Sequence, residues 1–224
     1  DLLSKIDMDN LGKSIFKKSL EGKSESIIAE IKKASPSAGL ISKDFDPVSK
    51  AKEYELFGAS ALSILTEEDY FQGDVQYLID VKNASNLPIL RKDFIIDEYQ
   101  IYESKLIGAD CILLIASILN DEELKIFSQI ADKLCLDYII EVHDKDELLR
   151  VKNFSKAIIG VNNRNLKTFE VDIENSIRLR KEFKEDNIFV SESGIKSQKD
   201  IDKLKEHNIN VFLIGESLMK GDLF

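Results

Sequence analysis

The sequence is poor in the residues from which metal and disulfide sites are built. Its 224 residues include two cysteines and two histidines. Cys111 and Cys135 show neither metal-ligand spacing nor a CxxC pair, so both are interpreted as small core residues in a reducing compartment. Two histidines are too few for a histidine-based zinc site without help from carboxylates. We therefore expect no bound metal and an exposed helical position for His207. His143 follows a strand end and could face a site, but a structural role is favoured.

Long apolar runs and an excess of positive charge are also absent. No stretch of about 18 apolar residues occurs, so no segment is expected to span a membrane. The N-terminal DLLSKIDMDN has no signal-peptide apolar core, and the missing initiator Met indicates trimming at that end. A net charge of −10 argues against a general nucleic-acid binder, which needs a basic face. We expect a cytoplasmic protein with no membrane or nucleic-acid partner.

What the sequence does contain is a regular series of short apolar runs. They lie roughly 20 to 35 residues apart, which is enough for a loop, a helix and a return in each βα unit. Nearly continuous Val, Ile and Leu is typical of parallel strands that are covered on both faces. The runs are Ile27–Ile31, Ala61–Leu65, Pro88–Leu90, Cys111–Ala116, Tyr138–Glu141, Ala157–Val161, Ile188–Ser191 and Val211–Ile214.

Helical patterns alternate with these runs. Asp46-Pro47 begins one in the manner of an N-cap and first turn, and Asn120, followed by three acidic residues, begins another. Further helices are predicted over Asp74–Asn83, Tyr99–Ile107, Lys145–Val151, Asp172–Phe183 and Lys199–His207.

Eight βα units predict a (β/α)8 TIM barrel that occupies residues 1–224 as a single domain. Residues 1–25 are predicted to form an N-terminal helical extension, because their apolar residues recur at helical spacing. A doubly wound open sheet is the alternative, although no GxGxxG follows the first strand.

Polar side chains close five of the predicted strands. Glu30 and Lys32 share the face of Ile28, since strand side chains alternate. A solvated edge explains any one such pair, but the pattern recurs in the strands that carry Lys92, Glu141, Asn162 with Arg164, and Glu192 with Ser193. In a barrel these side chains would form a ring at the carboxyl ends of the strands, where active sites lie.

A ring of carboxylates and cations is suited to acid–base catalysis. Neighbouring charges in a low-dielectric site split one another's pKa values, so that one group holds a proton near neutral pH while another accepts one. No Ser-His-Asp arrangement is evident, which disfavours acyl transfer. A Schiff base on Lys32 or Lys92 remains open.

The last two predicted strands end in glycine-containing loops. Ser193-Gly194 follows the seventh strand, and Gly215-Glu216 follows the eighth. In many barrels these two loops bind a phosphate through backbone N–H groups, and glycine permits the close approach. We therefore expect a small phosphorylated substrate, with Lys32 supplying additional positive charge.

Several longer segments, in order along nearly the whole chain, resemble the indole-3-glycerol phosphate synthase family of the tryptophan pathway. They are AEIKKASPS, LSILTEEDYFQG, PILRKDFIIDEYQI, GADCILLI, EVHD, GVNNRNL, SESGI and FLIGESLM. The resemblance implies a carboxy-lyase that closes, decarboxylates and dehydrates 1-(2-carboxyphenylamino)-1-deoxyribulose 5-phosphate. It also implies no cofactor, because the iminium formed on ring closure is itself the electron sink.

The same resemblance implies roles for individual residues. Lys92 matches the principal general acid of ring closure, and Glu141 the carboxylate that handles a proton during the loss of water. Glu30 and Asn162 match residues that hold the ribulose portion, and Glu192 a further carboxylate of the ring. The remaining matches contact substrate, brace the site or bind phosphate, with Glu216 contributing only its backbone N–H. They are Lys32, Ser35, Arg164, Ser193, Gly194, Gly215 and Glu216.

Two features depart from the family pattern. Family members usually have a longer segment before the first strand, whereas here it is short and the sequence contains no Trp. The sequence also stops at Phe224, before a full eighth helix. We expect either missing residues at the two ends or an incompletely covered barrel. The expected assembly is a monomer or weak homodimer, with association with other tryptophan-pathway enzymes as a further expectation.

Two other functions remain as alternatives. Phosphoribosylanthranilate isomerase uses an acid–base pair, commonly Cys and Asp, at the ends of strands one and five. Here those strand ends carry Glu30 and Glu141. A non-catalytic metabolite-binding barrel would keep the phosphate loops but need not keep Lys92 together with both glutamates.

Overall fold

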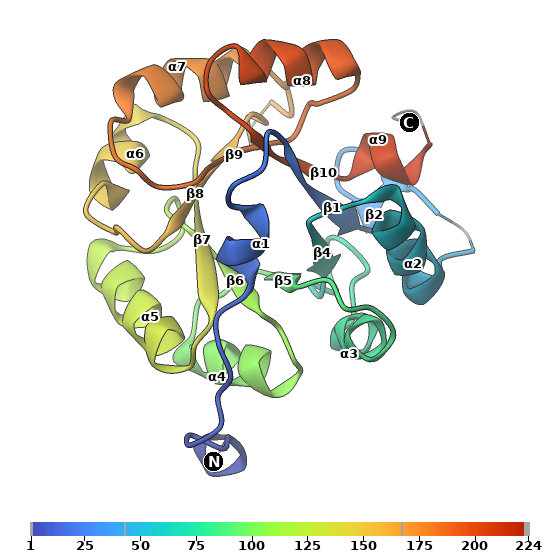
Figure 1. The fold of residues 1–224 in the computed structure, drawn as a ribbon, viewed down its shortest axis with the longest axis vertical. Coiled ribbons are helices and arrows are strands. Elements are labelled where there is room, and N and C mark those ends of the chain that lie inside the picture. The colour runs from blue at the N-terminus through green and yellow to red at the C-terminus, as the bar shows by residue number, and fades with distance from the viewer. Residues whose placement is uncertain (1, 43, 167, 222–224) are drawn as a thin grey trace.

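The computed structural model describes residues 2–42, 44–166 and 168–221. Across these residues eight parallel strands close into a barrel in the order β1-β10-β9-β8-β7-β6-β5-β4 (Figure 1). The sequence prediction of a (β/α)8 barrel is therefore confirmed, and the open-sheet alternative is excluded. The strands are β1 Ser26–Ile31, β4 Ala61–Leu65, β5 Ile89–Lys92, β6 Cys111–Ile115, β7 Asp137–Val142, β8 Ile158–Asn162, β9 Phe189–Glu192 and β10 Val211–Ile214.

Alternation along the strands divides the buried side chains into two sets. The inner set fills the barrel and includes Ile28, Leu90, Ile139 and Val190. The outer set lies between the strands and the helices, where Ile31, Leu62 and Ile140 are found. Because Glu30, Lys92, Glu141, Asn162 and Glu192 continue the inner rows toward the carboxyl ends of their strands, their side chains point into the mouth of the barrel.

A helix follows each barrel strand. The predicted starts at Asp46 and Asn120 are confirmed, because each side chain accepts a hydrogen bond from a first-turn backbone N–H. The last helix is a single turn. The helices are α2 Pro47–Phe57, α3 Val75–Ala84, α4 Glu98–Leu106, α5 Asp121–Lys133, α6 Lys145–Val151, α7 Glu174–Glu182, α8 Gln198–Lys205 and α9 Glu216–Met219.

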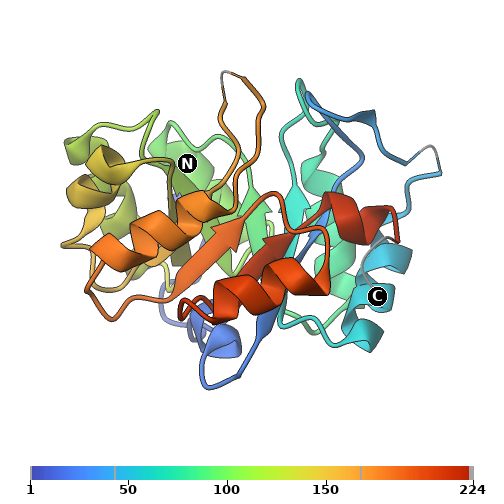
Figure 2. The same ribbon diagram turned by 90° about the horizontal axis from the view of Figure 1, so that it is seen from above.

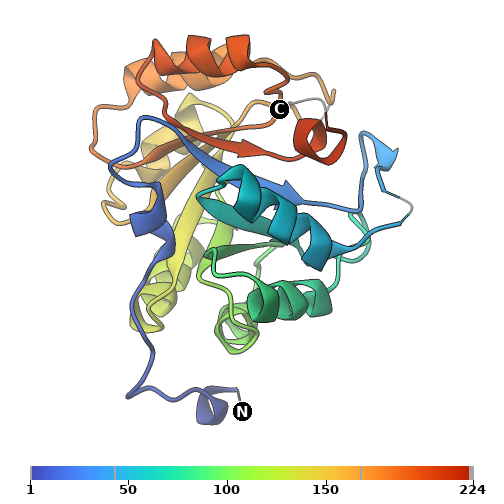
Figure 3. The same cartoon turned by 45° about the vertical axis from the view of Figure 1, so that its right-hand side comes forward.

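Residues 1–25 contain less helix than the sequence predicts. The described part holds only a 3-10 turn, Leu3–Lys5, and the five-residue helix α1, Phe16–Leu20. Gly12 and Gly22 both adopt positive φ angles, of 74° and 72°, which interrupt a helix on either side of α1. The chain between the 3-10 turn and α1 runs along a path away from the barrel (Figure 3), and the Leu11 carbonyl accepts a hydrogen bond from Lys105 Nζ of α4 at 2.8 Å.

Helix α1 closes the end of the barrel at which the strands begin. Phe16 and Leu20 are buried in the inner set of side chains. The backbone N–H of Lys17 donates to Asp137 Oδ2 at 2.8 Å, which ties α1 to the start of β7. In Figure 2 the loops after β1, β4 and β8 project from the opposite end of the barrel.

The loop after β1 contains a short hairpin, β2 Ala34–Ser35 with β3 Gly39–Leu40.

Among the described residues, no helix combines the length and apolar character needed to cross a membrane.

Candidate active site

A cavity of about 1010 Å³ opens at the carboxyl ends of the strands. Its lining comes from the loops that follow most of the barrel strands, so residues far apart in the sequence face one space. The predicted site residues that line it are Glu30, Lys32, Ser35, Lys92, Glu141, Asn162, Arg164, Ser193, Gly194, Gly215 and Glu216.

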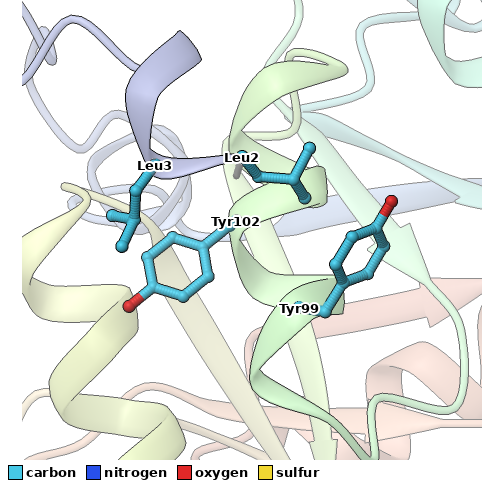
Figure 4. A pocket seen from close by; sticks show the side chains of 4 residues that line it. All are labelled: Leu2, Leu3, Tyr99 and Tyr102. Carbon is cyan, nitrogen blue, oxygen red and sulfur yellow. The ribbon is translucent and has the colours of Figure 1, made fainter.

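A second hollow, of about 470 Å³, lies where the N-terminal segment meets α4. Figure 4 shows its lining, Leu2 and Leu3 from the segment and Tyr99 and Tyr102 from the helix. None of these four side chains is a carboxylate or a cation, so the hollow lacks the groups for acid–base chemistry at neutral pH. The cavity at the strand ends is the candidate active site.

The ammonium group of Lys92 lies at the centre of the charged ring. Its Nζ is 2.6 Å from Glu192 Oε2, 3.7 Å from Glu141 Oε2 and 4.0 Å from Glu30 Oε2. Lys32 Nζ lies 2.6 Å from Glu30 Oε1, on the side of that carboxylate away from Lys92. Two lysines therefore face three carboxyl groups in the ring.

Burial and charge act in opposite directions on these groups. Burial alone would lower the pKa of Lys92, but Glu192, Glu141 and Glu30 raise it above its ordinary value. Burial would likewise raise the pKa of Glu30, yet Lys32 and Lys92 lower it. For Glu192 burial prevails, with the neighbouring carboxylates adding to it, and its pKa rises to about 7 despite Lys92.

Glu141 has a different environment. Burial raises its pKa, but a contact from His143, the charge of Lys92 and a hydrogen bond from Asn162 bring the pKa down to about 2. Asn162 Nδ2 donates to Glu141 Oε1 at 3.1 Å. Two carboxylates of one ring thus have separated pKa values, as an acid–base pair requires.

Two glycines leave the space that the ring carboxylates occupy. A Cβ on Gly160, in β8, would lie 2.1 Å from Glu192 Oε1. A Cβ on Gly215, after β10, would lie 2.4 Å from Glu30 Oε1. Neither glycine has a positive φ, so close approach rather than backbone conformation requires glycine here. The sequence interpretation gave Gly215 only a phosphate-binding role.

Two further candidates, Ser35 and Arg164, lie on the wall of the cavity and brace its loops. Ser35 Oγ accepts a hydrogen bond from the Ala38 N–H at 3.2 Å within the hairpin loop. Arg164 donates from its backbone N–H to Asn162 Oδ1 at 3.0 Å and from its guanidinium to the Phe169 carbonyl at 3.2 Å. These bonds fix the loop after β8 relative to the ring.

The two loops predicted to bind phosphate face the same cavity. Ser193 and Gly194 have φ angles of 68° and 84°, and the positive φ of Ser193 costs of order 1–3 kcal/mol for a residue with a side chain. A Cβ on Gly194 would lie 2.2 Å from Val171 Cγ1. The Glu216 side chain pairs with Lys220 Nζ at 2.6 Å, which occupies its carboxylate.

Glu192 is the predicted site residue that does not line the cavity. Its side chain is 1% exposed and lies beneath Lys92, which separates it from the open space. Its Oε1 is buried without a hydrogen-bond partner. Glu192 is therefore placed to act on Lys92 rather than on a molecule in the cavity.

Sequence reasoning missed the apolar part of the cavity wall. Exposed side chains from four loops lie there, among them Tyr70 and Phe94, whose rings pack edge to face with centroids 6.3 Å apart. The others are Ile118, Leu166 and Phe169. Exposed apolar residues in loops directly after strand ends were the available signal, since solvated loops are usually polar.

For His143 the sequence favoured a structural role over one that faces a site. Its imidazole Nε2 lies 3.3 Å from Glu141 Oε1, at ion-pair distance but without an aligned hydrogen bond. It continues the inner row of β7, Ile139 and Glu141, and this parity could have indicated its position. Within the described ranges, no group of three or more His, Cys, Asp or Glu side chains is arranged to hold a metal ion.

Comparisons with known proteins agree with the strand-end motifs. The family model described as indole-3-glycerol phosphate synthase matches residues 7–223. A protein of that name from Lachnoclostridium phytofermentans is 51% identical over 209 residues, covering 93% of this chain and 77% of the relative. Another from Ruminiclostridium cellulolyticum is 52% identical over 206 residues, covering 92% and 79%.

Solved structures show the same fold at much lower identity. The N-acetylmannosamine-6-phosphate 2-epimerase from Clostridium perfringens superposes with a TM-score of 0.68 at 13% identity, covering 91% of this chain and 90% of its own. That likeness concerns the barrel alone. The family model and the two relatives cover nearly all of the sequence, and on that basis the chain belongs to the indole-3-glycerol phosphate synthase family.

Proposed function

We propose that the cavity converts 1-(2-carboxyphenylamino)-1-deoxyribulose 5-phosphate to indole-3-glycerol phosphate, with the ring residues in the roles assigned below. The family consists of carboxy-lyases of tryptophan biosynthesis. The observation that carries the assignment is the Lys92 ammonium, held among three buried carboxylates and facing an open cavity.

Ring closure needs a proton donor at the ketone oxygen. As the aromatic carbon that bears the carboxylate bonds to the ketone carbon, the oxygen gains negative charge and must be protonated. Lys92 is the cation at the centre of the ring, and its raised pKa keeps it protonated at neutral pH. Glu192, with a pKa of about 7, lies 2.6 Å behind it and can return a proton after Lys92 has donated one.

The next two steps need an electron sink and a base. When carbon dioxide leaves, the electrons of the broken C–C bond stay in the ring and flow into the iminium that ring closure creates. The substrate itself therefore supplies the electron sink. Loss of water then needs a base to take a proton from the closed ring while an acid protonates the departing hydroxyl. Glu141 is ionised at neutral pH and lines the cavity, which suits the base, and Asn162 orients it.

The cavity is polar at one side and apolar at the other. The phosphate would bind at the loops that carry Ser193, Gly194, Gly215 and the Glu216 N–H, where Lys196 and Lys220 also line the wall. The carboxyphenyl ring would then lie against the apolar wall that contains Tyr70 and Phe94.

Lys32, Ser35, Arg164 and Glu30 would contact the part of the substrate between these ends. Lys32 is the cation of the cavity wall nearest Glu30, and it would pair with an anionic group of the substrate.

The experiment is a turnover assay on the purified chain. Addition of the ribulose phosphate substrate should produce the fluorescence of an indole without added metal or nucleotide. A flat trace at saturating substrate, with the fold verified by circular dichroism, would overturn the proposed function. A co-crystal with inorganic phosphate should place the ion between Gly194 and Gly215.

We further propose that residues 1–224 act as one (β/α)8 domain in the cytoplasm, as a monomer or weak homodimer. Association with other enzymes of the tryptophan pathway is part of the same proposal. Light scattering during gel filtration, over a range of protein concentrations, measures the assembly directly, and a stable higher oligomer would contradict it.

A further inference from the structure

His143 connects the ring to the outside of the barrel. It follows the last residue of β7, and its imidazole lies between two carboxylates: Nε2 is 3.3 Å from Glu141 Oε1, and Nδ1 is 3.2 Å from Glu147 Oε2. The side chain is 15% exposed and is not part of the cavity lining. The imidazole therefore reaches the proposed base from behind.

The backbone of His143 is held as firmly as its ring. Its N–H donates to Glu147 Oε2 at 2.7 Å, and its carbonyl accepts from Asn175 Nδ2, on α7, at 2.9 Å. Glu147 lies in the first turn of α6, and its own N–H donates to Asp144 Oδ1 at 2.9 Å. One carboxylate oxygen of Glu147 thus fixes both the main chain and the ring of His143.

The charges around the imidazole are one-sided. Burial would lower the pKa of His143, but Glu141 and Glu147 raise it to about 10. The charged groups that face this cluster are those two carboxylates and, on the far side of Glu141, Lys92. At neutral pH the arrangement is carboxylate, imidazolium, carboxylate, and the excess negative charge keeps the imidazole protonated.

We propose that His143 is a positioning residue that holds the Glu141 carboxylate in its catalytic orientation by bridging it to Glu147. The proposal rests on the proposed role of Glu141 as the base of the dehydration step. His143 is not itself the base, because both ring nitrogens face carboxylates and neither faces the cavity. Asn162 donates to the same Glu141 oxygen, so the two side chains leave Oε2 directed toward Lys92.

The bridge has a consequence for the pH dependence of catalysis. A base works only when ionised, and the imidazolium is one of the groups that keep the pKa of Glu141 near 2. Without it, burial of Glu141 is opposed only by Lys92 and Asn162. The acid limb of the kcat profile should then move toward neutral pH.

The decisive variant is His143→Asn. We expect kcat to fall roughly 10- to 100-fold, the effect of removing one charge-assisted contact, with KM changed less than kcat. The midpoint of the acid limb of the kcat profile should move up by about one pH unit or more. Unchanged kcat, or a uniform loss of kcat with the acid limb in place, would overturn the proposal.

Two further variants separate positioning from folding. Glu147→Gln keeps an acceptor for the His143 N–H but removes the outer negative charge. Its kcat should fall less than that of His143→Asn, and the acid limb of its kcat profile should shift in the same direction. If His143→Asn fails to fold, this variant carries the test. Lys145→Ala is the matched control: Lys145 lies on the same helix as Glu147, the variant removes only an exposed pair with Glu182 of α7, and the pH profile should not change.

A measurement independent of turnover distinguishes this inference from the proposed function. The sequence has two histidines, so the variant His207→Gln leaves a single imidazole for nitrogen-15 NMR. His143 should stay protonated through neutral pH and titrate near pH 10, and Glu147→Gln should lower that value. Titration near the ordinary pH of about 6.5 would overturn the bridge even in an active enzyme. If His143 titrates near pH 10 but the protein is inactive, the bridge stands and the proposed function is contradicted.

Discussion

Arg91 and Lys92 are consecutive cations of β5, one buried and one partly exposed, and they occupy opposite faces of the barrel wall. The Arg91 guanidinium points outward against α4 and is matched by partners. It donates to Asp93 Oδ2 at 3.0 Å, to Thr66 Oγ1 at 3.1 Å and to Ser104 Oγ at 3.2 Å, and it pairs with Glu103 at 2.8 Å. Lys92 points inward, where carboxylates outnumber cations and the group faces an open cavity.

The difference separates a cation that holds the fold from one available for chemistry. Directional hydrogen bonds occupy the guanidinium of Arg91 on several sides, and a saturated buried network of this kind rigidifies a structure. Lys92 instead shares its charge among three carboxylates, and their pKa values are pushed apart. A buried charge indicates catalysis when its neighbours are unbalanced and a molecule can reach it.

The largest effect that tests this comparison is expected from Lys92→Ala. Turnover should fall about 10²- to 10⁴-fold, the usual contribution of a positioned general acid. Product that carries a phosphate should still bind, because the loops at Gly194 and Gly215 are untouched. Steady-state kinetics and product titration measure the two quantities. Near-normal turnover would remove Lys92 from the chemistry and with it the contrast with Arg91.

Arg91→Met should have the opposite effect from Lys92→Ala: it should lower stability and leave turnover nearly unchanged. Removing the guanidinium leaves Asp93 without its buried counter-charge, and breaking such a pair costs roughly 3–5 kcal/mol of unfolding free energy. Turnover per folded molecule should stay within about twofold, an order-of-magnitude expectation for a residue outside the site. Urea unfolding and active-site titration test both halves. A loss of kcat at unchanged stability would show that the outer face also serves catalysis.

Gly160→Ala should disturb the ring without removing a charge. The added methyl would contact Glu192 Oε1 and Ile139 Cγ2, and such overpacking costs about 1–3 kcal/mol. Displacement of Glu192 from Lys92 should also lower turnover. In the background Glu192→Ala the space is vacated, so the stability cost of Gly160→Ala should shrink there. Equal costs in both backgrounds would mean that the clash lies elsewhere.

The smallest effect is expected from Glu192→Gln, which should change the slope of stability against pH. The pKa of Glu192 is raised from 4.5 to about 7 in the folded protein, so the folded state binds the extra proton between these pH values. The contribution of Glu192 to wild-type stability should therefore fall as pH rises from 4.5 to 7, by at most about 1.4 kcal/mol per pH unit. The variant should lack this decline. Thermal midpoints across that range measure it, and identical slopes would contradict the assigned pKa.

Strand parity carried most of what the sequence could predict. Ile28, Glu30 and Lys32 share a face whatever surrounds them, and closure of the barrel brings Glu30 to Lys92 and Glu141. Helix starts were equally accessible, because the caps at Asp46 and Asn120 are local hydrogen bonds. Both signals depend on neighbours along the chain.

The missing parts depend on contacts between distant segments. The helical spacing of residues 1–25 was real, but the turns at Gly12 and Gly22 leave only α1 in place beneath the barrel. The space at Gly160 is defined by Glu192, which comes from the next strand. Two partners of Arg91, Glu103 and Ser104, lie on α4, and strand parity does not predict which helix covers the outer face. The depth of Glu192 beneath Lys92 likewise follows from packing.

Among the described residues, α1 covers the end of the barrel where the strands begin, and the cavity opens at the opposite end. With Phe16 and Leu20 filling the end where the strands begin, carbon dioxide, water and the indole product must all leave through the mouth by which the substrate entered. With the proposed function, the bulky indole product would lie above the ring, and the small products would have to pass it or leave after it. An exogenous amine that replaces the Lys92 side chain must use the same passage, so bound product should block chemical rescue of Lys92→Ala.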